Sequence, residues 1–349
     1  MIDVLIVDDS ASMRLFLERI FSADPGIRVV GAARNGEEAI AMVERLNPHV
    51  VTMDIYMPRL NGLDATRRIM ETRPTPIVIL SGNLDPEEVL TSFRAMEAGA
   101  LAALPKPRGA GHPDHEREVG ELVRKVKLMA EVKVVKRWPR AGKSPASTLP
   151  REMPVMAAPG KLQAVAIGAS TGGPVVIQTI LSGLRGDFPA PVLVVQHMAA
   201  GFIQGFAEWL ALSSRLPVHV AFQEEQILPG HVYVAPDNLH MLVEAGGRIR
   251  LSDAPPENGL RPSVAALFRS VADVYGRNAA GVLLTGMGRD GVDDLLLLKG
   301  KGAVTIAQDR ESSVIYGMPG EALRTGAASY ALSPDRIVAM LERLAPRGR

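Results

Sequence analysis

The 349-residue chain contains no cysteine, and this absence removes several kinds of chemistry at once. Without cysteine there is no disulfide, no thiol nucleophile and no cysteine-ligated zinc, and such a chain fits a reducing compartment. No apolar run reaches the length of about 18 residues that a membrane-spanning helix needs. The N-terminal segment MIDVLIVDDS has neither a basic n-region nor an unbroken apolar core. We therefore expect a cytoplasmic protein without membrane insertion.

A surplus of charge is also missing, because 39 lysine and arginine residues stand against 38 aspartate and glutamate residues, a net charge of +1. This balance does not favour a nucleic acid or another polyanion as a partner. Apolar residues make up 47% of the chain, enough for a buried core in each of the two domains that the length favours.

Alternating apolar runs and helix-like stretches predict an α/β fold for both halves of the chain. In residues 1–130 the apolar runs are 3–7, 28–32, 49–53, 76–80 and 100–104. This alternation indicates a flavodoxin-like (βα)5 domain with a parallel sheet covered on both faces. Residues 131–160 are rich in proline and basic residues and predict a solvated linker.

A second α/β domain is expected over residues 161–349. Its sheet is predicted to be doubly wound and mostly parallel, and short alternating runs within 217–251 predict an antiparallel extension.

Polar residues stand at the expected strand ends of the first domain: Asp8, Asp9, Asp54, Ser81 and Lys106. The carboxyl ends of parallel strands meet at one edge of a sheet, so we expect these side chains to converge. Three carboxylates repel one another unless a cation joins them, and Mg²⁺ suits oxygen ligands of this kind. The sequence predicts a Mg²⁺ site here, with a lysine ammonium beside it.

The same rule applied to the second domain places Ser170, His197 and Asp290 after three apolar runs. A hydroxyl, an imidazole and a carboxylate are the groups that nucleophilic acyl transfer needs. The segment GASTG around Ser170 fits the G-x-S-x-G pattern. His197 is the histidine that follows a strongly apolar run. For the carboxylate, Asp290 in a glycine-rich loop is favoured over three other candidates, namely Asp237, Asp253 and Asp309.

Two other kinds of site fit poorly. The order Ser, His, Asp differs from the Ser, Asp, His order of common α/β-hydrolases. The loop around Ser170 lacks G-x-G-x-x-G and the lysine of a phosphate-binding loop, so nucleotide binding is the weakest hypothesis.

Residues 1–130 resemble a two-component receiver domain through VDDS (7–10), MDIYMPRLNG (53–62), ILSG (79–82) and the pair Lys106-Pro107. The resemblance implies that Asp54 accepts a phosphoryl group and holds Mg²⁺ with Asp8 and Asp9. It further implies that Ser81 and Lys106 sense the phosphoryl group, and that the Lys106–Pro107 bond is cis. Ala103 stands where receivers usually carry an aromatic switch residue, which leaves the coupling to the outer surface open.

The whole chain resembles the CheB family of chemotaxis response regulators. The residues that carry the resemblance are IGASTGGP (167–174), VVQHM (194–198), PGHVYVAP (229–236), RPSV (261–264), LTGMGRDG (284–291) and AQD…YGMP (307–319). It implies a catalytic triad of Ser170, His197 and Asp290. It also implies an oxyanion donor in the backbone N–H of Met287, with that of His197 as a second candidate, and a positioning role for Thr171.

The resemblance implies a protein-glutamate methylesterase and protein-glutamine deamidase that needs no cofactor for ester hydrolysis. Its substrates would be glutamate γ-methyl esters and glutamines on the cytoplasmic helices of chemoreceptors, and its phosphodonor a chemotaxis histidine kinase. The receiver would cover the esterase cleft until Asp54 is phosphorylated. Two alternatives remain: a response regulator whose second domain only binds a partner, and a hydrolase of small esters.

Overall fold

The computed structural model describes residues 1–82, 85–134 and 162–346. The chain divides into two compact units, Met1–Ala141 and Gly142–Arg349, and each is described by itself. From residue 135 onward, the predicted linker lies outside the described residues.

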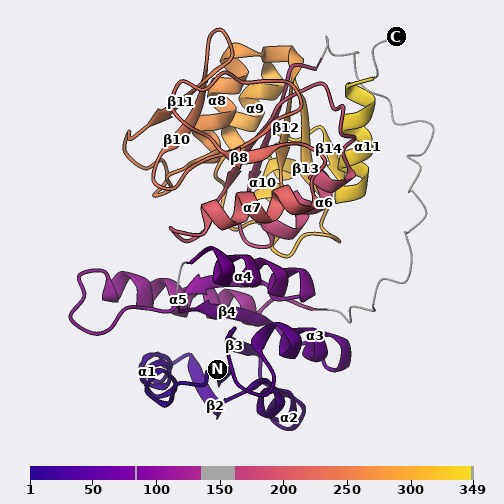
Figure 1. The fold of residues 1–349 in the computed structure, drawn as a ribbon. Coiled ribbons are helices and arrows are strands. Elements are labelled where there is room, and N and C mark those ends of the chain that lie inside the picture. The colour runs from indigo at the N-terminus through magenta and orange to yellow at the C-terminus, as the bar shows by residue number, and fades with distance from the viewer. Residues whose placement is uncertain (83–84, 135–161, 347–349) are drawn as a thin grey trace. The chain divides into compact units, whose positions relative to one another are not determined.

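The first unit is a parallel five-stranded sheet with strand order β2-β1-β3-β4-β5 (Figure 1). The strands are β1 (Ile2–Val7), β2 (Ile27–Ala33), β3 (Val50–Asp54), β4 (Ile77–Ser81) and β5 (Ala102–Pro105). The helices are α1 (Ala11–Ser22), α2 (Gly36–Leu46), α3 (Gly62–Thr72), α4 (Pro86–Ala98) and α5 (His115–Ala130). All residues of β3 and β4 are buried, as expected for central strands covered on both faces. The predicted (βα)5 fold is confirmed.

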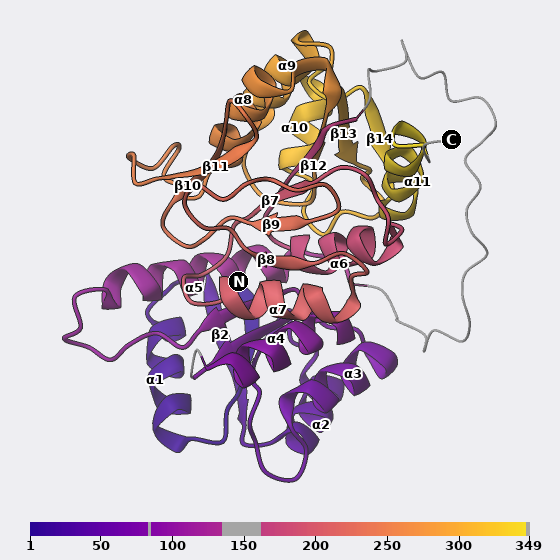
Figure 2. The same cartoon turned by 45° about the horizontal axis from the view of Figure 1, so that its top comes forward.

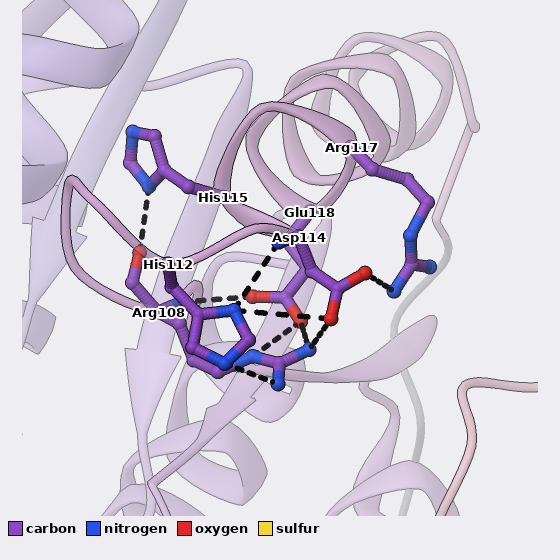
Figure 3. Close-up of polar contacts among 6 residues, drawn as sticks. All are labelled: Arg108, His112, Asp114, His115, Arg117 and Glu118. Atoms are coloured by element: carbon purple, nitrogen blue, oxygen red, sulfur yellow. Dashed lines mark hydrogen bonds and ion pairs between the residues drawn. The ribbon is translucent and has the colours of Figure 1, made fainter.

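A polar network closes the loop between β5 and α5 (Figure 3). The Arg108 guanidinium donates to Glu118 Oε1 at 2.8 Å and to Asp114 Oδ2 at 2.8 Å. The backbone carbonyl oxygen of Arg108 lies 2.6 Å from His115 Nδ1. The Asp114 side chain does not cap α5, so this network fixes the start of the helix instead.

The prediction of a cis bond at Lys106–Pro107 is wrong. The cis peptide bond in the described part of the chain is Arg261–Pro262, and Lys106–Pro107 is trans. Even before proline the trans form is favoured, by about 0.5–1 kcal/mol.

The second unit is built on a seven-stranded parallel sheet with strand order β14-β13-β12-β6-β7-β9-β8. The strands are β6 (Ala164–Ala169), β7 (Val192–Gln196), β8 (Val218–Val220), β9 (Val232–Val234), β12 (Ala279–Leu283), β13 (Val304–Gln308) and β14 (Tyr330–Leu332). The helices are α6 (Gly173–Gly183), α7 (Ile203–Ser213), α8 (Val264–Val274), α9 (Val292–Gly300), α10 (Met318–Arg324) and α11 (Pro334–Leu344), with a short 3₁₀ helix η1 (Gly276–Asn278).

The predicted antiparallel strands are present as a separate two-stranded sheet, β10 (His240–Glu244) with β11 (Arg248–Ser252). The other strands within 217–251, β8 and β9, instead pair in parallel and join the main sheet. Helix α8 packs against both β10 and α9, and Figures 1 and 2 show these elements side by side. This packing brings β10 close to the loop that follows β12.

Candidate functional site

The carboxyl ends of β1, β3 and β5 bring charged side chains together in the first unit. Asp8, Asp9 and Asp54 present carboxylate oxygens that lie within 4.8 Å of one another. Lys106, just beyond β5, places its Nζ 2.7 Å from Asp8 Oδ2 and 3.0 Å from Asp54 Oδ2. Asp8 and Asp54 are buried, whereas Asp9 is exposed. The predicted residues therefore converge, and the single ammonium contacts both buried carboxylates but offsets only one negative charge.

Burial governs the ionisation of this cluster. Desolvation raises the pKa of Asp54 to about 6 against the opposing charge of Lys106, and the Asp8 charge adds to the rise. For Lys106, desolvation would lower the pKa, but the hydrogen bond to Asp8 and the charge of Asp54 outweigh it, and the pKa is raised. Three carboxylates within reach of one another fit the oxygen ligands that Mg²⁺ prefers.

The backbone beside Asp54 leaves no room for a side chain at Gly62. A Cβ there would lie 1.9 Å from the Asp54 carbonyl oxygen. The Gly62 N–H donates to the Ile55 carbonyl at 2.9 Å, and the side chain of Asn61 accepts from the Asp64 N–H at 2.8 Å. The glycine thus lets α3 begin directly against the end of β3.

Ser81 donates to a buried carboxylate that sequence reasoning missed. Its Oγ lies 2.7 Å from Glu88 Oε1, which also accepts from the Gly82 N–H at 2.6 Å. Glu88 is buried in the first turn of α4 and donates its own N–H to the N-cap residue Asp85. Acidic residues are common in first turns, so nothing in the sequence distinguished this one.

In the second unit the polar residues follow three neighbouring strands. Ser170 follows β6, His197 follows β7, and Asp290 lies in the loop between β12 and α9. His197 Nε2 lies 3.0 Å from Asp290 Oδ2. Ser170 and Asp290 are buried, and 10% of the His197 side chain is exposed. Nε2 is therefore the ring nitrogen that lies nearest the Asp290 carboxylate.

The N-terminus of α8 holds Asp290. Its Oδ2 accepts from the Val264 N–H at 2.7 Å, and its Oδ1 accepts from Ser263 Oγ at 3.0 Å and from the Ala265 N–H at 3.3 Å. Burial would raise the pKa of Asp290, but the hydrogen bond and charge of His197 and these donors outweigh it, so the pKa lies below its ordinary value. The carboxylate is therefore kept ionised in a buried place.

Backbone contacts on both sides fix the loop that carries Ser170. Its N–H donates to the Thr285 carbonyl at 3.0 Å. Gln196 Nε2 donates to the carbonyl oxygens of both Ser170 and His197, each at 2.8 Å. A Cβ at Gly286 would lie 2.7 Å from the Ser170 Cβ, so only glycine fits there. The serine and histidine loops are thus tied to each other and to the loop that follows β12.

Met287 and Thr171, the remaining predicted site residues, lie in the same loops. The side chain of Met287 is exposed. Thr171 is buried, and its carbonyl accepts from Thr285 Oγ1 at 3.0 Å. The second candidate oxyanion donor, the His197 N–H, already donates to the Ala169 carbonyl at 2.9 Å, where it extends the pairing of β6 with β7.

The three aspartates considered as alternatives to Asp290 make hydrogen bonds within other loops. Asp237 Oδ2 accepts from the Gly201 N–H at 2.8 Å, and Asp309 Oδ1 accepts from the Ser312 N–H at 3.0 Å. The Asp253 carbonyl oxygen accepts from Arg261.

Sequence reasoning missed three polar residues behind the site: Gln196, Ser263 and His240. Gln196 is the last residue of β7. Ser263 is the N-cap of α8, which a serine before an apolar helix pattern does indicate. His240 opens β10 and is buried. Their contacts join segments far apart in the sequence, so no local pattern indicated that these residues meet beside the site.

Among the described residues, no helix combines the length and apolar character needed to cross a membrane.

Comparisons with known proteins agree with this arrangement. Residues 4–112 match the family model of the response regulator receiver domain, and residues 165–341 match that of the CheB methylesterase. The protein-glutamate methylesterase/protein-glutamine glutaminase 4 of Geobacter metallireducens is 66% identical over 99% of both chains. The protein-glutamate methylesterase/protein-glutamine glutaminase of Nitrosospira multiformis is 55% identical over 100% of this chain and 98% of its own.

Among solved structures, the CheB methylesterase catalytic domain of Thermotoga maritima is similar at a TM-score of 0.51 and 37% identity. That likeness covers 52% of this chain and 98% of the other. From its matched domains and its full-length relatives, the chain belongs to the CheB family of protein-glutamate methylesterases/protein-glutamine glutaminases, with a response regulator receiver domain ahead of the methylesterase domain.

Proposed function

We propose that this protein is a serine hydrolase that removes methyl groups from glutamate γ-methyl esters on chemoreceptor cytoplasmic helices and deamidates receptor glutamines. The observation that carries the proposal is the contact of His197 with the buried Asp290, 3.0 Å apart, beside the tethered Ser170 loop. A base oriented by an ionised carboxylate is what a serine nucleophile requires.

In the proposed reaction, His197 Nδ1 takes the proton of Ser170 Oγ as that oxygen attacks the ester carbonyl. The imidazolium then returns a proton to the leaving group, which departs as methanol from an ester or as ammonia from a glutamine. Water, deprotonated by His197, hydrolyses the acyl-enzyme and restores the Ser170 hydroxyl. Asp290, 3.0 Å from Nε2, orients the ring and stabilises the imidazolium. We assign the oxyanion to the backbone N–H of Met287, and Thr171 to positioning of the loop.

The receiver unit is proposed to regulate this reaction. Asp54 would accept the phosphoryl group from a histidine kinase, and Asp8, Asp9 and Asp54 would hold Mg²⁺. The ion would neutralise charge that develops during phosphoryl transfer. Lys106, already 3.0 Å from Asp54, would pair with the phosphoryl oxygens. The domains are proposed as residues 1–130 and 161–349, joined by the linker 131–160.

The test is methanol release from a methylated receptor cytoplasmic fragment, with and without Mg²⁺ and a small-molecule phosphodonor. Ser170→Ala runs beside the wild type. We expect Ser170→Ala to lose at least about 10³-fold in rate, because the nucleophile is removed. We expect the phosphodonor to stimulate only the wild type.

The alternative outcomes separate the competing functions. Substantial turnover by Ser170→Ala would refute the triad. Intact receptor binding without methanol release would favour a binding-only output domain. Hydrolysis of small esters with none of the methylated receptor would favour a small-ester hydrolase.

A further inference from the structure

From Oδ1 of Asp290, a chain of hydrogen bonds runs through Ser263 to another histidine. Ser263 Oγ is 3.0 Å from Asp290 Oδ1, and the Ser263 N–H donates to His240 Nδ1 at 3.3 Å. His240 Nε2 lies 3.2 Å from the Pro255 carbonyl oxygen. Ser263 and His240 are buried as completely as Asp290 itself. The proposed triad uses neither residue directly.

The direction of each hydrogen bond follows from the groups involved. Asp290 is kept ionised and can only accept, so the single hydroxyl proton of Ser263 points to it. His240 Nδ1 faces a backbone N–H and must be the acceptor, while Nε2 faces a carbonyl and must carry the proton. His240 is therefore held as its neutral Nε2–H tautomer with both nitrogens satisfied.

The far end of the chain is also fixed. The loop that contains Pro255 is tied down by Arg261, whose Nη1 donates to the Asp253 carbonyl at 2.7 Å and to the Ala254 carbonyl at 3.2 Å. His240 begins β10, which packs against α8. The chain thus connects the hairpin β10–β11 to the carboxylate that faces His197.

We infer that Ser263 and His240 are positioning residues of the hydrolase, an inference that rests on the proposed function. The Ser263 hydroxyl fixes the rotation of the Asp290 carboxylate and keeps Oδ2 toward His197. Neutral His240 fixes the N-cap of α8, from which three donors reach Asp290: Ser263 Oγ and the backbone N–H groups of Val264 and Ala265.

The experiment compares two serines of the same segment in the full-length chain. Ser263→Ala removes the hydroxyl that contacts Asp290. The matched control is Ser270→Ala on α8, because Ser270 Oγ accepts from the Val243 N–H of β10 at 3.0 Å but does not contact Asp290. Each variant removes the hydroxyl of a serine in or next to α8 and the hydrogen bonds that it makes. If Ser263 has only a structural role, the two variants should therefore lower the rates to a similar extent. Thermal unfolding is recorded for each variant.

Two rates are measured: methanol release from methylated receptor, and labelling of Ser170 by a fluorophosphonate probe. The probe reports on the triad without any receptor. We expect Ser263→Ala to lower kcat and the labelling rate about 10- to 100-fold, the effect of losing a hydrogen bond to a charged group, with KM nearly unchanged. Ser263→Thr, which keeps a hydroxyl, should recover most of both rates.

His240 is tested in the same way. His240→Leu should lower both rates about 3- to 10-fold, and His240→Asn, which keeps an acceptor for the Ser263 N–H, should recover them. The inference is overturned if Ser263→Ala stays within about threefold of the wild type, or slows labelling no more than Ser270→Ala does.

Failure of the proposed function gives a different result. A wild type that is labelled at Ser170 but releases no methanol refutes the substrate, and the labelling ratios still decide the inference. A wild type that is not labelled refutes the triad and the inference together.

Discussion

At Gly286 the backbone of the loop after β12 passes against the side chain of the proposed nucleophile. An added Cβ would lie 2.7 Å from the Ser170 Cβ and 2.5 Å from Met318 Sδ. The methionine end can move, but Ser170 is held by the Thr285 carbonyl and by Gln196. A methyl group at this position must therefore displace the serine or the loop itself.

We predict that Gly286→Ala lowers methanol release by at least about 10-fold, and up to about 100-fold, because a displacement of about 1 Å costs that much in a positioned reaction. Gly300→Ala is the control, since a Cβ at Gly300 in α9 meets nothing within 4 Å. Release by Gly286→Ala equal to that of Gly300→Ala would show that the loop yields without effect on the serine.

At the residue scale, the strand-end rule placed Asp54, Ser170, His197 and Asp290 where the structure has them. These residues could be predicted because parallel strands deliver their carboxyl ends to one edge. Ser263 and Asp290, by contrast, are 27 positions apart and meet through α8 packing. The sequence marks Ser263 as a helix cap, but it does not state which carboxylate receives its hydroxyl proton.

Among the elements, α5 begins without a side-chain cap and relies on the network of Arg108 (Figure 3). Glu118 accepts from the Arg108 guanidinium at 2.8 Å and from the Arg108 N–H at 2.9 Å. The hydrogen bond from the Arg108 side chain outweighs the opposing effect of desolvation and, with the Arg108 N–H and the Arg108 charge, lowers the pKa of Glu118 from 4.5 to about 2.

We predict that Glu118→Gln lowers the free energy of unfolding of the receiver unit at pH 7 by up to about 1 kcal/mol, the range of ion pairs near a surface. Because the folded-state pKa is depressed, the stabilisation is present above pH 4.5 and is lost as the pH falls toward 2. Urea unfolding at pH 7, 4 and 3 should show the difference from wild type shrinking with pH.

Glu116→Gln is the matched control, because Glu116 lies in the same first turn, is exposed and loses the same charge. An equal loss in both variants would assign the effect to the helix dipole rather than to Arg108.

Element positions were predicted better than element pairing. The run 3–7 became β1 at Ile2–Val7, and the run 191–195 became β7 at Val192–Gln196. Strands β8 and β9 have three residues each, and their parallel pairing depends on the main sheet that receives them. A local alternation of apolar residues does not indicate which strand the segment will pair with, or in which direction.

For the whole molecule, the two compact units separate the proposed phosphorylation from the proposed hydrolysis. We predict that Asp54→Asn keeps a low basal rate of methanol release and loses stimulation by phosphodonor, because the phosphoryl acceptor is gone while the second unit is untouched. Release is measured with Mg²⁺ and a small-molecule phosphodonor, with Asp64→Asn, a partly exposed aspartate of α3, as the control.

Strong stimulation of Asp54→Asn would contradict the assignment of the phosphoryl acceptor. A wild type that releases methanol but does not respond to phosphodonor would instead indicate that Ala103, at the place of the usual aromatic residue, disables the switch.

The contact between Thr285 and Thr171 joins positions 114 residues apart, and β6 pairs with β12 over a similar separation. Loops of this length are slow to close, and parallel pairing between distant strands delays folding. The hydrolytic centre therefore exists only after the last of these long-range pairings has formed. After dilution from denaturant, helical circular dichroism should return first and esterase activity last, so that turnover reports complete folding of the second unit.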